Sequence, residues 1–106
     1  MSYKIVFDRT ADKDFRRLPS EVQQAFSRKL SALADDPHPS DSRKLEGTHD
    51  CYRIRQGDYR LIYTVTEDRI VVLILRVGHR SSIYRAIPDL GRAVRKRKGN
   101  DDADHL

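Results

Sequence analysis

Tryptophan is absent from this chain of 106 residues, and cysteine occurs only once, at Cys51. A single cysteine excludes an internal disulfide, and a zinc site would depend on four histidines that are scattered along the chain. No apolar run approaches the roughly 20 residues that a membrane-spanning helix needs. Because the sequence begins directly with an alternating segment, we expect no signal peptide. We therefore expect a protein without metal, cofactor or membrane contact, in a reducing, cytoplasmic setting.

Charge, in contrast, is plentiful. Charged residues make up 35% of the chain and hydrophobic residues 38%, which is typical of a polar globular domain with one modest core. Lys and Arg number 21 against 16 Asp and Glu, so the formal net charge is +5. A positive balance favours polyanionic partners, either nucleic acid or an acidic protein.

The first third of the chain predicts one strand and two helices. Apolar residues alternate over residues 3–8, as in a half-buried strand, and recur at helical spacing over residues 9–18, where a proline ends the helix. A second helix is predicted from Ser20 to Asp36, and Ser20 and Gln23 have the spacing of a capping box. Its apolar stripe consists of Val22, Phe26, Leu30 and Leu33.

The rest of the ordered pattern predicts strands. Residues 37–50 are rich in Pro, Ser, Asp and Gly and are interpreted as a loop. Residues 51–56 and 59–66 predict a hairpin, with Cys51 buried at its start. Residues 69–77 are apolar on both faces, which predicts the central strand of the sheet.

The predicted order is β-α-α-β-β-β. We expect an α+β domain with a mostly antiparallel four-stranded sheet and the two N-terminal helices packed on one face. The domain is predicted to span residues 1–87. Residues 88–106 are punctuated by Pro and Gly and predict a basic tail that is partly helical or disordered.

Three arginines lie in the predicted hairpin among residues that are normally buried. Because side chains alternate along a strand, Arg53 and Arg55 share one face, and the turn brings Arg60 beside Arg55. Like charges placed directly opposite each other destabilise a sheet. This arrangement therefore indicates that the arginines bind a ligand rather than stabilise the fold. The alternative interpretation is a solvated face, with the arginine stems lying over the sheet.

Further cations follow in the next strand and after it. Arg76 lies in that strand, and the segment VGHRSSIY contributes His79, Arg80 and Tyr84. We expect these groups to converge with the hairpin arginines on one concave face. The planar fork of a guanidinium pairs two phosphate oxygens at once, so the pattern predicts a cradle for phosphate.

Several motifs of the chain resemble the RelE branch of the RelE/ParE toxin superfamily, the toxins of bacterial and archaeal toxin–antitoxin pairs. The similarity runs from Tyr3 to about Ile87 and includes the order of the elements. Its most specific parts are KLEG at 44–47, DCYRI at 50–54, GDYRLIY at 57–63 and VGHR at 77–80.

The resemblance implies a metal-independent endoribonuclease that enters the ribosomal A site and cuts the bound messenger RNA. The messenger's 2′-hydroxyl attacks the neighbouring phosphate, leaving a 2′,3′-cyclic phosphate and a free 5′-hydroxyl. By position, the family's active residues correspond in this chain to Arg53, Arg55, Arg60, Arg80 and Tyr84. Contacts to RNA are assigned to Lys44, Arg53, Arg55 and Arg76.

The chain departs from the family's well-known members at the proton acceptor. Those members carry lysines where this chain has Arg53 and Arg55, and an arginine, with a pKa above roughly 12, does not serve as a base. The spacing before Tyr84 is also shorter, which puts its position in question. His79 is the first substitute for the base, Tyr84 is the second because neighbouring cations favour its phenolate, and Glu46 is the third.

Two other functions stay open. One is a ParE-like inhibitor of DNA gyrase without nuclease chemistry, and the other is a non-catalytic interaction module. For the nuclease, the resemblance implies the ribosome and messenger RNA as partners. It also implies a RelB-type antitoxin whose amphipathic helix and acidic residues cover the basic cleft, and operator DNA bound through the toxin–antitoxin complex.

Overall fold

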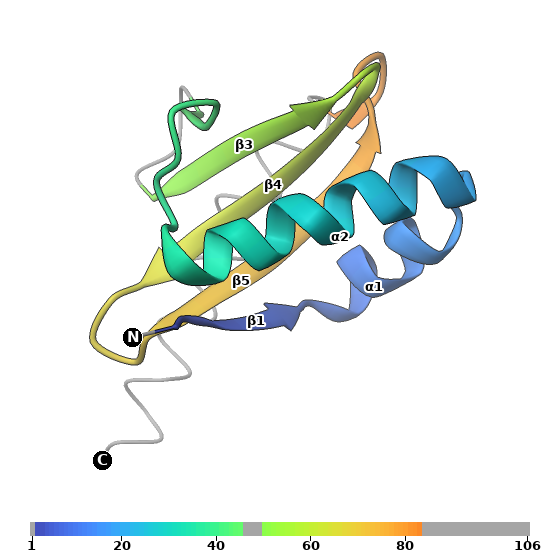
Figure 1. The fold of residues 1–106 in the computed structure, drawn as a ribbon. Coiled ribbons are helices and arrows are strands. Elements are labelled where there is room, and N and C mark those ends of the chain that lie inside the picture. The colour runs from blue at the N-terminus through green and yellow to red at the C-terminus, as the bar shows by residue number, and fades with distance from the viewer. Residues whose placement is uncertain (1, 46–49, 84–106) are drawn as a thin grey trace.

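The computed structural model describes residues 2–45 and 50–83, so Glu46, Tyr84 and the predicted tail lie outside the described residues. Two helices and a five-stranded sheet form the domain (Figure 1). The strands lie in the order β1-β5-β4-β3-β2, with β1 parallel to β5 and the other neighbours antiparallel. The elements are β1 (Lys4–Phe7), α1 (Arg9–Arg16), α2 (Ser20–Asp35), β2 (Arg43–Lys44), β3 (Cys51–Gln56), β4 (Tyr59–Thr66) and β5 (Val71–His79).

This architecture confirms the predicted α+β fold and its order of elements, with two differences. The segment predicted as a loop contains the two-residue strand β2, so the sheet has five strands rather than four. The central strand is β4 and not, as predicted, the strand that follows it. The reason is that β2 adds a strand beyond β3, so β4 has two strands on each side, whereas β5 has only β1 beyond it.

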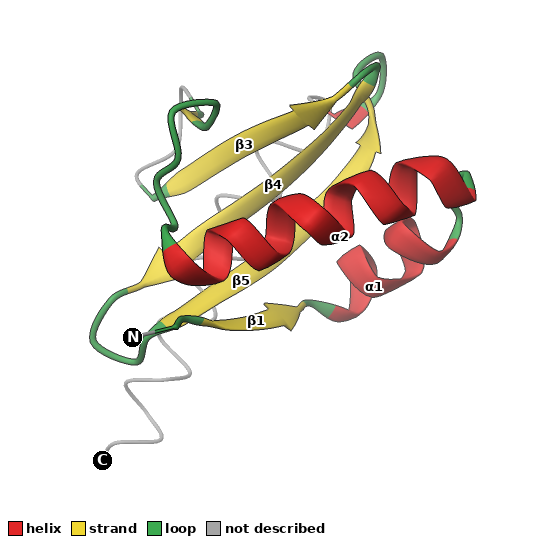
Figure 2. Ribbon diagram, viewed as in Figure 1, coloured by secondary structure: helices red, strands yellow, loops and turns green. Residues whose placement is uncertain are grey.

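Both helices cover the same face of the sheet (Figure 2). The predicted stripe of α2 packs here, with Phe26, Leu30 and Leu33 buried and Val22 half-buried against them. The predicted capping box is wrong: Ser20 makes no side-chain cap. The side-chain amide of Gln23 instead donates to the carbonyl oxygens of Arg16 and Leu18, at 3.3 and 3.0 Å, and so satisfies the end of α1.

Tyr63 lies at the centre of this helix-side core. Its ring is fully buried, and its hydroxyl donates a hydrogen bond of 2.8 Å to the carbonyl oxygen of Pro37. Burial disfavours the phenolate and raises the pKa of Tyr63 from 10.0 to about 12. The role of this tyrosine is therefore structural.

The opposite face of the sheet carries a second, smaller apolar cluster. Cys51 is 1% exposed within it, which confirms the prediction of a small buried residue. Four consecutive residues of β4, from Leu61 to Thr64, are buried, because this strand is covered on both faces. The other members of the cluster are Leu45, Ile62, Leu75 and Ile83.

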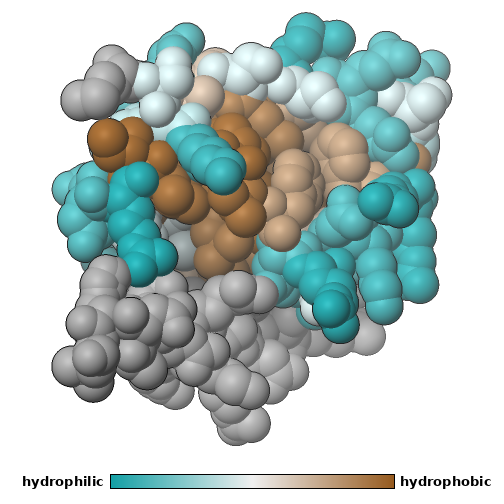
Figure 3. All heavy atoms as spheres, turned by 90° about the horizontal axis from the view of Figure 1, so that it is seen from below, coloured by the Kyte–Doolittle hydropathy of each residue, from teal (hydrophilic) through white to brown (hydrophobic). Residues whose placement is uncertain are grey.

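The β1 edge of the sheet is partly apolar. Seen from this side, brown and tan side chains form a band between hydrophilic regions (Figure 3). Three residues of β1 have half-buried apolar side chains, namely Ile5, Val6 and Phe7.

Within residues 2–45 and 50–83, neither helix has the length and apolar character needed to cross a membrane.

Candidate active site

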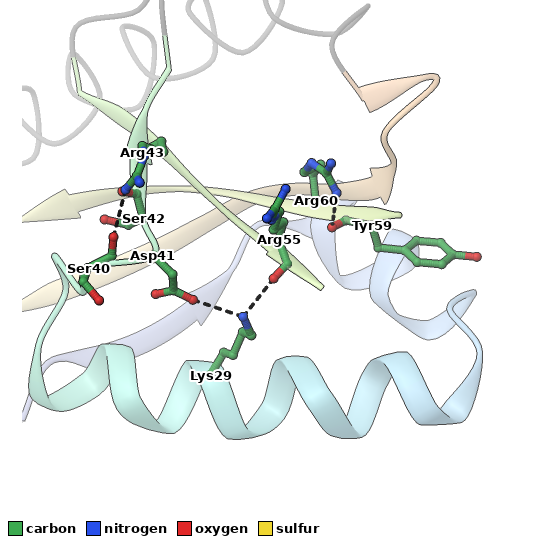
Figure 4. Close-up of polar contacts among 8 residues, drawn as sticks. All are labelled: Lys29, Ser40, Asp41, Ser42, Arg43, Arg55, Tyr59 and Arg60. Atoms are coloured by element: carbon green, nitrogen blue, oxygen red, sulfur yellow. Dashed lines mark hydrogen bonds and ion pairs between the residues drawn. The ribbon is translucent and has the colours of Figure 1, made fainter. Parts of the chain in front are cut away.

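The hairpin arginines occupy the face of the sheet that the helices leave open. Arg55 stands directly opposite Arg60 in the β3–β4 register, which confirms the predicted cross-strand pair. Ile54, between Arg53 and Arg55, is buried in the helix-side core, so the two flanking arginines point the other way. Figure 4 shows the side chains of Arg55 and Arg60 directed away from α2.

A lysine of α2 holds the arginine-bearing strand from behind. Lys29 Nζ donates to the carbonyl oxygen of Arg55 at 2.9 Å and to the carboxylate of Asp41 at 3.0 Å (Figure 4). One side chain thus ties α2 to β3 and to the segment that leads into β2. The backbone of β3 is fixed while the guanidinium of Arg55 stays exposed.

Strand β2 adds an arginine that sequence reasoning missed. Arg43 pairs with Arg53, and Lys44 pairs with Tyr52. Residues directly opposite in an antiparallel pair share a face, so Arg43 lies on the arginine face and Lys44 lies on the face of Tyr52, toward the helices. The predicted RNA contact at Lys44 is thus displaced from the cluster. Two residues without an apolar or alternating pattern give no strand signal within a segment that predicts a loop.

The guanidinium of Arg60 is anchored by the hairpin itself. Its Nη1 donates to the carbonyl oxygens of Gly57, at 2.8 Å, and of Tyr59, at 3.1 Å. Its Nε is buried and has no hydrogen-bond partner among the residues the structure describes. Gly57 has a φ of 60°, so the turn uses the left-handed conformation that glycine adopts without strain.

The same turn positions Arg80. The Arg80 backbone N–H donates to the Asp58 carbonyl oxygen at 2.7 Å, and Arg80 Nε lies 3.4 Å from Asp58 Oδ1. The two side chains are 62% and 64% exposed. Ion pairs this exposed contribute little free energy, so the Arg80 guanidinium can exchange Asp58 for another anion at little cost.

An open hollow of about 400 Å³ lies at this end of the sheet. It is lined by Arg60, His79, Arg80 and Ser81, and so unites three of the six predicted catalytic residues. The His79 ring packs edge to face on Tyr59, with centroids 5.5 Å apart. Its Nδ1 lies 2.8 Å from Ser81 Oγ and 3.1 Å from the Ser81 backbone nitrogen. A hollow bordered by two arginines and a histidine offers side chains that can bind a phosphate group.

Arg76, which was predicted to contact RNA, is engaged elsewhere. Its Nε lies 2.8 Å from Asp14 Oδ2 of α1, and the same oxygen accepts the N–H of Val77 at 3.2 Å. Strand β1 ends before this point, so Asp14 satisfies a backbone group at the open edge of β5. The carboxylate offsets the charge of Arg76 and draws it toward the helices.

Tyr84 and Glu46 lie outside the described residues. No group of three or more His, Cys, Asp or Glu side chains suited to a metal ion occurs among residues 2–45 and 50–83.

The fold and the hollow together define a class: a small α+β domain with a basic hollow at one end of its sheet. A family profile described as the ParE toxin of the type II toxin–antitoxin system parDE matches residues 5–84. That match spans more than half of the chain, and the chain therefore belongs to the RelE/ParE toxin family.

Similar proteins place the chain in the RelE branch. It is 38% identical over 88 residues to the mRNA interferase toxin RelE of Escherichia coli K12, a match that covers 79% of this chain and 92% of that protein. It is 35% identical over 89 residues to toxin RelG of Mycobacterium tuberculosis, with 80% and 99% covered.

Solved structures agree in fold. The isolated E. coli RelE toxin has a TM-score of 0.68 at 34% identity, covering 83% of this chain and 97% of that chain. The toxin in the archaeal RelE–RelB complex from Pyrococcus horikoshii has a TM-score of 0.66 at 35% identity, covering 76% and 97%. The resemblance seen in the motifs is thereby confirmed.

Proposed function

We propose that this chain is the toxin of a type II toxin–antitoxin pair and that it cleaves messenger RNA in the ribosomal A site. One observation carries the proposal: Arg60, His79 and Arg80 line one hollow in a chain 38% identical to a protein named an mRNA interferase. Two fixed positive charges beside an imidazole suit the phosphate at which RNA is cut. The toxin domain is proposed to span residues 1–87, followed by a basic tail.

The proposed reaction needs no water and no cofactor. The 2′-oxygen of one nucleotide attacks the adjacent phosphorus while a base accepts the proton of the 2′-hydroxyl. The bond from phosphorus to the 5′-oxygen breaks, and an acid donates a proton to the leaving 5′-oxygen. Arg60 and Arg80 stabilise the additional negative charge on the pentacoordinate phosphorus. Arg53 and Arg55 hold neighbouring phosphates, and Arg43 extends the same basic surface.

The residue that accepts the 2′-hydroxyl proton is not an arginine, because guanidinium stays protonated throughout the accessible pH range. Cleavage therefore relies on charge stabilisation and alignment by the arginines, with the base supplied by another group. The candidates for that group are those expected from the sequence: His79 first, then Tyr84, whose phenolate neighbouring cations would favour, and then Glu46.

The proposed partner is a RelB-type antitoxin, by analogy with the RelE–RelB complexes of the similar structures. The arginine face of β3 and β4 is positively charged, so we expect acidic residues of the antitoxin to cover it. The same contact would exclude messenger RNA and inhibit the toxin. The complex is proposed to bind its operator DNA mainly through the antitoxin.

The test is to induce the chain in cells without its antitoxin and to map RNA ends. The expected result is arrested translation and messenger RNA cut within codons, with 5′-hydroxyl and 2′,3′-cyclic phosphate ends. The matching profile is described as ParE, so a gyrase inhibitor is the second candidate. Intact messenger RNA together with broken chromosomal DNA would reject the nuclease and support that candidate.

A further inference from the structure

Two contacts fix the ring of His79 at the end of β5. The Tyr59 ring packs against the imidazole in a T-shaped contact, with an angle of 85° between the two ring planes. Its Nδ1 faces Ser81, whose backbone nitrogen lies at 3.1 Å and whose Oγ lies at 2.8 Å. These contacts give the exposed imidazole a preferred orientation.

The contact to the Ser81 backbone decides which ring nitrogen carries the proton. A backbone N–H can only donate, so Nδ1 must accept and must lack a hydrogen. The Ser81 hydroxyl is compatible with this state, because it can donate to the same nitrogen. A neutral imidazole has one N–H, which this geometry places on Nε2.

We infer that His79 acts as a neutral hydrogen-bond donor to the scissile phosphate through Nε2–H, and that it is not the base. The inference rests on the proposed function, and it corrects the expectation that His79 is the first substitute for the missing lysines. No proton changes hands at His79. Its N–H supports the charge that develops on a phosphate oxygen, next to Arg60 and Arg80. Ser81 is a positioning residue that fixes the tautomer.

The tautomer can be measured without any assay of activity. Long-range ¹H–¹⁵N correlation spectra of the full chain, at about pH 8.5, where an ordinary imidazole is neutral, distinguish Nδ1–H from Nε2–H. We expect Nε2–H in the wild type and in Ser81→Ala, because this variant keeps the backbone N–H. Ser81→Pro removes that N–H and should give a mixture of tautomers. A wild-type spectrum with the proton on Nδ1 would overturn the inference.

Two substitutions at His79 then separate the donor from the base. The side-chain amide of glutamine can place an N–H near the position of Nε2, whereas alanine removes the donor and neither residue is a base. Cleavage of ribosome-bound message should fall by about 10²–10³-fold in His79→Ala, as for loss of an oxyanion-hole donor. His79→Gln should recover most of that loss.

Equal loss of cleavage in His79→Gln and His79→Ala would reject the donor role. Failure of the proposed function looks different: the wild type itself would leave the message intact, while the spectra would still report the tautomer. That result would reject the action of His79 on phosphate, and only the tautomer set by the contact with Ser81 would remain supported. Circular dichroism of both variants confirms that each substitution leaves the fold in place.

Discussion

The two faces of the sheet follow opposite rules. On the helix side, Phe26, Leu33 and Tyr63 are buried, and the Tyr63 hydroxyl has a partner in the Pro37 carbonyl. On the open side, Arg55 stands opposite Arg60. Apolar burial and satisfied polar groups stabilise the first face. The second face also has a small apolar cluster, but repulsion between like charges weakens it where Arg55 and Arg60 meet. The comparison teaches that the arginines of the open face give up some stability at the positions proposed to bind an anion.

The largest effect on the helix-side face is expected from Phe26→Ala. Phe26 has no exposed surface, and truncating a buried phenylalanine typically costs about 3–5 kcal/mol in the free energy of unfolding. Urea unfolding measures the loss. Val22→Ala, at a half-buried position of the same helix, is the matched control and should cost clearly less. Equal losses at the two positions would mean that the core is not centred on Phe26.

The next largest effect is expected on the open face, from Arg80→Ala. Removing one positive donor from the hollow should lower cleavage of ribosome-bound messenger RNA by about 10²–10³-fold. The free energy of unfolding should change by less than about 0.5 kcal/mol, because the Asp58–Arg80 pair is exposed. A thermal melt and a cleavage assay on the same preparation test both halves.

Two further variants sharpen this result. Arg80→Lys keeps the charge but not the planar fork, so we expect only partial recovery. Arg28→Ala removes an exposed arginine from α2 and should leave cleavage unchanged. If Arg28→Ala were as damaging as Arg80→Ala, net charge rather than the hollow would control activity.

A smaller effect is expected from Tyr63→Phe, and it depends on pH. Losing the hydrogen bond to Pro37 should cost about 1 kcal/mol near neutral pH. The raised pKa of Tyr63 adds a second signature. In the wild type, the unfolded chain releases this proton near its ordinary pKa of 10.0 and the folded chain at about 12. The contribution of the protonated Tyr63 hydroxyl to the free energy of unfolding is therefore fully present below about pH 10, and it is lost as the pH rises toward 12.

Tyr63→Phe has no such proton, so its difference from the wild type should shrink as the pH rises through this range. Urea unfolding at several alkaline pH values measures the trend. Tyr3→Phe, at a half-buried position, serves as the control and should keep the alkaline decline of the wild type. If the free energy of unfolding of Tyr63→Phe declined by the same amount at alkaline pH, groups other than Tyr63 would be the cause of the decline.

The helix-side face was largely predictable from the sequence. The stripe that ends at Leu33 and the alternation along β3 and β4 both follow from local periodicity. The position of β4 at the centre was not predictable, because it depends on the edge strands β1 and β2, and the parallel pairing of β1 with β5 is non-local. The predicted capping box at Ser20 is wrong for a similar reason: the Gln23 side chain donates to backbone carbonyls at the end of α1 and just after it.

The open face was predictable only in part. Register follows from a tight turn, so the pairing of Arg55 with Arg60 could be anticipated. Arg43 was missed because two residues are too few to show a strand pattern. The pairing of Arg76 with Asp14 joins residues 62 positions apart, and no spacing rule in the sequence predicts it.

The smallest predicted effect tests the comparison of the two faces most directly, because one substitution is expected to raise stability and to lower cleavage. Replacing Arg55 by threonine removes one of two like charges that face each other and introduces a residue with high β-propensity. We expect the free energy of unfolding to rise by about 0.2–1 kcal/mol, while cleavage of ribosome-bound messenger RNA falls. Urea unfolding and the cleavage assay, run beside Arg28→Ala, measure the two changes. If Arg55→Thr lowered stability as well, Arg55 would contribute to the fold, and the open face would not be a surface that gives up stability to bind an anion.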